Sequence, residues 1–161
     1  MSLEVTQANN SIDLVTSRLQ SFWKDLKKAI PEAELFETKR SNERQTYLYS
    51  LGRTRSGEIV TYATAGNSPH NHGLAFDIRN VNFTNREKDI RELLSKNSDI
   101  AWGMDFWRID TKTKKKVKFP DSAHFQIKGW RRFVPGLNGK IIFPIVAVIG
   151  ISIYSLRGKR K

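Results

Sequence analysis

Residues 68–77 read SPHNHGLAFD, a short stretch that combines two histidines, a glycine and an aspartate. Alternating apolar and polar residues over 74–78 predict a β-strand, and Asp77 lies on it. His70 precedes that strand, in a segment whose proline and glycine are typical of a turn. The stretch therefore places a histidine-bearing turn directly before a strand that carries an acid.

Two other segments have the composition of short strands. They are residues 59–63 and 124–127, and both are rich in β-branched or aromatic residues. The second begins at His124, within the stretch DSAHF at 121–125. The three predicted strands are too short to bury a core alone, so helices must cover them.

Three helices are predicted around these strands. Apolar residues recur at helical spacing over 12–30, and Pro31 ends that run. A second helix is expected to begin at Ser41 and to end near Gly52. A third is expected over 87–94. The fold class that follows is α+β, a small antiparallel sheet flanked by helices.

The composition fits one small domain with a basic surface. The chain has 161 residues, no cysteine and three histidines, so a transition metal would have only histidine and carboxylate ligands. Net charge is +12, and a lysine-rich stretch at 112–118 predicts a hairpin tip or an exposed loop. Such a surface favours polyanions. No nucleic-acid partner is expected, because no arginine-rich helix, zinc-finger spacing or RNA-binding aromatic signature is present.

The C-terminal segment differs from the rest of the chain. Residues 141–156 carry no charge and are followed by the basic end RGKRK. A helix over them would span about 24 Å at ~1.5 Å per residue, short of the ~30 Å hydrocarbon core, although flanking cations can snorkel. We expect the domain that carries the histidines and most of the acids at 1–135 and a C-terminal transmembrane helix with its basic tail at 136–161. A buried β-hairpin or core helix is the alternative.

Histidines and acids in these two stretches could form a catalytic metal centre. Zinc in such a centre takes three protein ligands and leaves one position open. His70, Asp77 and His124 provide nitrogen and oxygen donors, and one carboxylate leaves the zinc enough charge to lower the pKa of water. Asp121 would then be free to act as a base. From residue types alone, the histidines could equally be surface or hydrogen-bonded core residues.

The spacing of these residues resembles the LAS-type zinc peptidases, which include D-alanyl-D-alanine carboxypeptidases and phage L-alanyl-D-glutamate endolysins. The match covers roughly residues 35–130 and is most like the endolysin branch. Its motif residues are Ser68, His70, Gly73, Ala75 and Asp77, then Asp121 and His124, with Trp102-Gly103 between them and Arg40, Gln45 and Gly52 upstream. The resemblance implies a hedgehog/DD-peptidase-like fold.

The resemblance also implies roles for individual residues. His70, Asp77 and His124 become zinc ligands, Asp121 the catalytic carboxylate, and Arg40 the cation that steadies the oxyanion, with a solvated helix-start cation as the alternative for Arg40. Two more residues are candidate substrate contacts, each with an ordinary alternative: turn chemistry for Ser68 and an exposed helix position for Gln45. His72 is expected to be a bystander or a pocket-rim residue.

The function that follows is a zinc metallopeptidase hydrolysing the peptidoglycan stem peptide, with the L-alanyl-D-glutamate bond as its target. A D-Ala-D-Ala carboxypeptidase is the alternative enzyme. The non-enzymatic alternatives are a cell-wall-binding module and a structural virion membrane protein with an inactive peptidase fold. We expect no signal peptide, because residues 1–14 lack a basic stretch followed by an apolar core. We therefore expect a membrane-associated phage lytic enzyme, in the virion membrane or the host inner membrane.

Overall fold

The computed structural model describes residues 3–110 and 112–137. The helices are α1 (Leu3–Thr6), α2 (Ser17–Ala29), α3 (Asn42–Ser50) and α4 (Phe83–Ser95). The strands are β1 (Glu34–Glu37), β2 (Ala75–Arg79), β3 (Ile100–Trp102), β4 (Trp107–Ile109), β5 (Lys116–Lys118) and β6 (His124–Ile127). Short 3-10 turns are η1 (Ile12–Leu14), η2 (Pro69–His72), η3 (Gly103–Asp105) and η4 (Trp130–Phe133).

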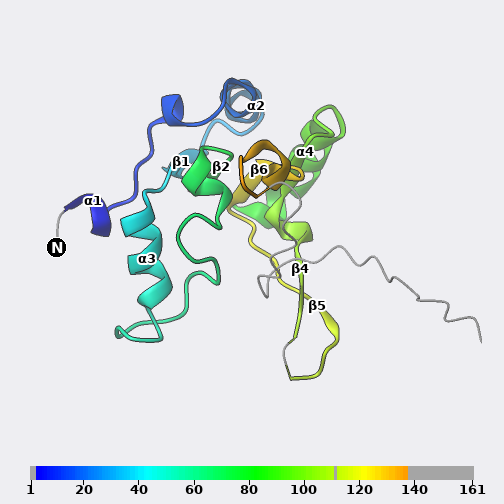
Figure 1. Ribbon diagram of the computed structural model, residues 1–161. Helices are drawn as coiled ribbons and strands as arrows, with labels where there is room; N and C mark the ends of the chain where they lie inside the picture. Colours follow the sequence, from blue (N-terminus) through cyan, green and yellow to red (C-terminus); the bar gives the residue numbers. More distant parts are fainter. Residues whose placement is uncertain (1–2, 111, 138–161) are drawn as a thin grey trace, which may run out of the picture.

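The strands form a four-stranded sheet and a separate hairpin. The sheet has the order β1-β2-β6-β3, and each neighbouring pair is antiparallel. Strands β4 and β5 pair with each other in an arm that extends from the body of the molecule (Figure 1). The predicted α+β class with an antiparallel sheet is confirmed, and the lysine-rich stretch is a hairpin as predicted.

Alternation along the central strands gives the sheet two different faces. Phe76 and Ile78 of β2 lie on the same face as Phe125 and Ile127 of β6. All four are buried, and they share a core with α2 and α4 that includes Leu19, Phe22, Leu26 and Ile90. The opposite face carries the polar residues of the same strands. The core therefore fixes which side chains of β2 and β6 are available for chemistry.

The predicted helices are present with shifted boundaries. The first begins at Ser17 rather than Ile12, because η1 interrupts the run. The second begins after Ser41, whose side chain accepts a hydrogen bond of 3.1 Å from the backbone N–H of Arg44, so this N-cap is confirmed. The third, α4, is longer than predicted and is capped in the same way by Asn82.

The predicted strand at 59–63 is wrong. This segment pairs with no strand among the described residues, and the sequence prediction also missed β1 and β3. Two carbonyl groups that strand pairing would need accept hydrogen bonds from side chains instead. Gln45 donates to the oxygen of Ala63 at 2.6 Å, and Arg53 donates to that of Thr61 at 3.1 Å. The segment is instead a loop, most exposed at Val60.

The predicted C-terminal transmembrane helix lies outside the described residues, since residues 138–161 are not among them. In the part of the chain that the structure does describe, no helix has the length and apolar character needed to cross a membrane.

Candidate metal centre and groove

Three predicted ligands converge on the polar face of the sheet. Asp77 of β2 lies directly opposite His124 of β6 in the antiparallel register, which brings their side chains together. His70 reaches the same point from η2, the turn that precedes β2. Gly73 ends that turn with a φ of +65°, and a Cβ there would lie 2.6 Å from the backbone oxygen of Leu14. Glycine is therefore required at this turn, which passes close to the backbone of residues 14–15 before β2 begins.

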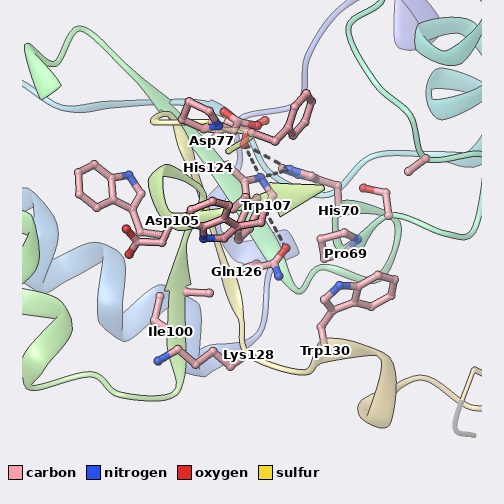
Figure 2. A pocket seen from close by; sticks show the side chains of 18 of the residues that line it. Pro69, His70, Asp77, Ile100, Asp105, Trp107, His124, Gln126, Lys128 and Trp130 are labelled. Atoms are coloured by element: carbon pink, nitrogen blue, oxygen red, sulfur yellow. Dashed lines mark hydrogen bonds and ion pairs between the residues drawn. The ribbon is translucent and has the colours of Figure 1, made fainter. Parts of the chain in front are cut away.

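The three atoms that could bind a metal, one from each residue, form a small triangle (Figure 2). His124 Nδ1 lies 2.9 Å from Asp77 Oδ1 and 3.2 Å from His70 Nε2, and the distance from His70 Nε2 to Asp77 Oδ1 is 3.3 Å. Ligand atoms held about 2.0–2.1 Å from a tetrahedral zinc lie about 3.3 Å from one another. The spacing of the triangle therefore fits a zinc-sized ion.

Hydrogen bonds on the outer side of each histidine show why a cation is needed. His70 Nδ1 lies 2.7 Å from the carbonyl oxygen of Thr38, so that nitrogen carries the proton. His124 Nε2 lies 2.9 Å from Gln126 Oε1 and is a donor in the same way. In the neutral imidazoles, the inner nitrogens then point lone pairs at each other and at the Asp77 carboxylate. Only a proton or a metal ion can hold three acceptors together, and such outer partners are typical of metal-binding histidines.

The sequence analysis missed both of these outer partners. Gln126 lies two residues after His124 on the same strand, so period-two alternation could have placed it beside the histidine. The carbonyl of Thr38 follows β1, and no residue type in the sequence marks a backbone acceptor.

Charges in the centre favour an ionised aspartate. Burial would raise the pKa of Asp77, but His70 and His124 outweigh it and hold that pKa well below its ordinary value. Burial would also lower the pKa of His124, whereas the hydrogen bond and charge of Asp77 raise it overall. In the absence of a metal, these shifts favour protonation of His124 beside an ionised Asp77.

Arg40 lies against the outer oxygen of Asp77. Its Nη2 is 3.7 Å from Asp77 Oδ2, while Oδ1 faces the histidines. Glu37, which is almost fully buried, accepts from both Arg40 and Arg44, and Gln45 Oε1 accepts from Arg40 Nη1 at 2.8 Å. Arg40 is thus a buried, fixed cation, so the alternative of a solvated helix-start cation is wrong. The sequence analysis missed Glu37, because it lies on β1 and meets Arg40 only through the fold.

Asp121 lines the same pocket, and the Trp102-Gly103 segment fixes its loop. Trp102 Nε1 donates to the carbonyl of Ser122 at 2.7 Å, and the backbone N–H of Asp121 donates to that of Gly103 at 3.0 Å. Although Asp121 is exposed by surface area, the protein atoms around its carboxyl partly desolvate it and raise its pKa; the negative charge of Asp77 adds to this rise and His124 opposes it. A carboxyl of raised pKa beside a metal-type centre is suited to carrying protons.

The remaining predicted residues lie around this centre in different ways. Ser68 is buried and lines the pocket at the start of η2. Gln45 is fully buried and supports Arg40 and the loop at Ala63, so it has no surface for the predicted substrate contact and is not an exposed helix residue either. His72 points elsewhere: its ring stacks on Trp130 and its Nε2 lies 2.8 Å from the oxygen of Gly66.

The pocket is an open groove of about 1350 Å³ that crosses the polar face of the sheet. One wall is the loop around Thr61 and Tyr62, and another is the base of the β4–β5 hairpin with Trp107. Lys128 and Trp130 line it beyond β6, as Figure 2 shows. The groove is wide enough to accept a peptide chain across the three converged side chains.

Comparison with known proteins points to cell-wall peptidases. No known family model matches the chain. The chain is 40% identical over 67 residues to the peptidoglycan L-alanyl-D-glutamate endopeptidase CwlK of Bacillus subtilis (strain 168), a match that covers 42% of this chain and 32% of CwlK. The predicted resemblance to LAS-type peptidoglycan peptidases is confirmed. The matched region spans about a third of the length of that relative.

Two solved structures are similar at lower identity. The LdcB LD-carboxypeptidase is 21% identical with a TM-score of 0.48, covering 77% of this chain and 75% of LdcB. The L-Ala D-Glu endopeptidase ChiX of Serratia marcescens is 17% identical with a TM-score of 0.44, covering 76% of this chain and 87% of ChiX.

Proposed function

We propose that this protein is a zinc-dependent peptidase that hydrolyses an amide bond of the peptidoglycan stem peptide, with the L-alanyl-D-glutamate bond as its target. The observation that carries the chemistry is the convergence of His70, Asp77 and His124, with three acceptor atoms between 2.9 and 3.3 Å apart. The match to CwlK supports the choice of bond.

Each residue of the centre has a part in this proposal. His70, Asp77 and His124 would hold the ion, which when bound supplies a Lewis acid for water and for the scissile carbonyl. Asp121 takes a proton from the attacking water and passes it to the leaving amine, a task for which a raised pKa is suited. Arg40 adds fixed positive charge beside the developing oxyanion. Ser68, on the groove wall, orients the substrate.

Digestion of purified muropeptides followed by mass spectrometry tests this function. We expect products with a new L-alanine carboxyl end and a free D-glutamate amine, and we expect a chelator to stop their formation. Loss of D-alanine alone would show a D-Ala-D-Ala carboxypeptidase instead. Unchanged muropeptides with zinc present would refute the peptidase and leave a cell-wall-binding module or a structural virion protein.

We also propose that the protein is a membrane-associated phage lytic enzyme, in the virion membrane or the host inner membrane. The uncharged run at 141–156 and the basic end that follows it support membrane association. The resemblance to phage endolysins supports the source. The test is membrane fractionation of the full chain beside a chain that ends at residue 137. Recovery of both chains in the soluble fraction would contradict the proposal.

A further inference from the structure

The β4–β5 hairpin has one face that combines apolar rings and cations. In its antiparallel register Trp107 pairs with Lys118 and Ile109 with Lys116, so these four side chains share a face. Trp107 is 38% exposed and Ile109 is 37% exposed, so both apolar side chains are accessible on the arm. Lys116 Nζ lies 4.8 Å from the Trp107 ring centre, so charge and ring form one surface. We refer to these four residues as the hairpin face.

The arm carries far more positive than negative charge. Its cations are Arg108, Lys112, Lys114, Lys115, Lys116 and Lys118, and its acid is Asp110. The Asp110 carboxylate accepts hydrogen bonds from the backbone N–H groups of Lys112 at 3.1 Å and Thr113 at 2.6 Å. The acid therefore closes the turn, and one negative charge against six cations leaves the arm strongly positive.

The other side of the arm attaches it to the groove. The Arg108 guanidinium lies 4.7 Å from the ring centre of Phe119 and 5.3 Å from that of Tyr62, which belongs to the neighbouring loop that also lines the groove. The backbone N–H of Phe119 also donates to the oxygen of Phe106 at 2.8 Å. These contacts hold the base of the arm at the groove, with the hairpin face on the side away from Arg108.

The hairpin face is continuous with the candidate active site. Trp107 and Lys116 line the same groove as His124 and Asp121. A chain that lies across the metal centre and leaves the groove on this side passes over Trp107 and its lysines. Lysines alone would suffice for a small anion, whereas a flat ring beside lysines complements a chain that carries both carboxylates and apolar groups.

We propose that the hairpin face is an accessory binding site for the carboxylate-bearing peptide of the polymer whose bond is cut in the groove. The proposal rests on the proposed function for the identity of that polymer. Lys116 and Lys118 pair with carboxylates of the peptide beyond the scissile bond, and Trp107 packs against its apolar part.

The test is binding of the full chain to insoluble peptidoglycan freed of phosphate polymers. Asp121→Asn serves as the background so that the material is not digested. We expect the Lys116→Gln/Lys118→Gln pair to weaken binding by roughly 3-fold to 30-fold at moderate salt. Lys116→Arg/Lys118→Arg should restore it. Amidation of the peptidoglycan carboxyls should remove the difference between these variants.

The matched control is Lys24→Gln/Lys28→Gln, which makes the same change of charge on α2, at the other end of the molecule from the arm (Figure 1). Equal weakening by both pairs would overturn the proposal and leave only a general charge effect. So would a difference between the lysine variants that survives carboxyl amidation, or lysine-dependent binding seen only with anionic vesicles or with phosphate-rich wall polymers. Thermal melting of each variant confirms that the fold is intact.

Failure of this proposal differs from failure of the proposed function. If the hairpin variants bind normally while the unmodified enzyme cleaves stem peptides, the accessory site is refuted and the peptidase stands. If stem peptides are never cleaved while the lysines still govern carboxylate-dependent binding, the hairpin face stands and the peptidase is refuted.

Discussion

At the scale of single residues, the two oxygens of Asp77 have different neighbours. Oδ1 faces both histidines, and Oδ2 faces Arg40, which Glu37 and Gln45 hold in place. This arrangement presents one oxygen of the carboxylate to the centre. We therefore expect Arg40 to position the Asp77 carboxylate, in addition to the oxyanion role that the resemblance implies.

We predict that Arg40→Met weakens zinc binding by roughly 10-fold to 100-fold, the usual effect of losing a partner of a metal ligand. Arg40→Lys should recover part of it. Competition with a chromogenic chelator measures the Kd for zinc without reference to activity. A normal Kd combined with a lower kcat would show that Arg40 acts on the reacting carbonyl alone.

We expect substitution of Asp121 to separate metal binding from turnover. We predict that Asp121→Asn retains one zinc per chain and lowers kcat by roughly 100-fold to 10,000-fold, because the proton carrier is lost while the ligands remain. His124→Ala should lose both zinc and activity. Metal content and muropeptide turnover measured on the same preparations check this. Full activity of Asp121→Asn would remove Asp121 from the mechanism.

The metal-free centre should make stability depend on pH. The pKa of Asp77 is lowered from 3.8, so its contribution is present above pH 3.8 and is lost as pH falls through the folded value. The pKa of His124 is raised from 6.5, so its contribution is present below pH 6.5 and is lost as pH rises through the folded value. We predict that metal-free protein has a lower Tm at pH 8.5 than at pH 6.

The comparison with Asp77→Asn identifies the source of that change. Without the carboxylate, the raised pKa of His124 has lost its cause, and the fall in Tm between pH 6 and pH 8.5 should be smaller. An equal fall in both proteins would place the titrating group elsewhere.

At the scale of elements, the turn after β3 positions Asp121. A Cβ at Gly103 would lie 2.2 Å from the backbone oxygen of Asp121, so the two backbone segments touch. Together with the hydrogen bond from Trp102 to Ser122, this contact explains why a tryptophan–glycine pair precedes the final motif.

We predict that Gly103→Ala displaces the Asp121 loop and lowers kcat by roughly 10-fold to 100-fold, since a small misplacement of a reacting group is costly. Zinc affinity should be unchanged. In an Asp121→Asn background the same substitution should cause little further loss of kcat. A substantial additional loss there would mean that Gly103 acts through something other than Asp121.

The elements that the sequence revealed are those whose local signals agree with the fold. Strands β2 and β6 alternate clearly, and Ser41 caps α3, so all three were predictable. Strand β1 escaped prediction because it begins and ends with glutamate, and β3 because it has only three residues. Residues 59–63 have strand composition, but Gln45 and Arg53 occupy the carbonyls that pairing would need.

The residues of the candidate site also divide into those that the sequence indicated and those that it did not. Residue types and spacing indicated His70, Asp77, Asp121 and His124, because each supplies an imidazole or carboxylate group that the proposed chemistry requires. The burial of Gln45 and the partnership of Arg40 with Glu37 depend on how α3 packs against β1, which no short motif records. Supporting residues are therefore harder to predict than the atoms that they support.

At the scale of the whole molecule, the two faces of the four-stranded sheet have different roles. Its apolar face packs with α2 and α4, and its polar face carries the candidate metal centre and the groove that the hairpin borders. Stability and chemistry thus depend on opposite faces of the same strands, and substitutions in the groove can be made with little cost to the core.

X-ray absorption at the zinc edge on the full chain, loaded with one equivalent of zinc, tests this account most directly. We predict two imidazole ligands and oxygen donors at about 2.0–2.1 Å, and one imidazole fewer in His124→Ala. Zinc that is lost on gel filtration, or a coordination shell without imidazole, would contradict the claim that His70, Asp77 and His124 form a metal centre.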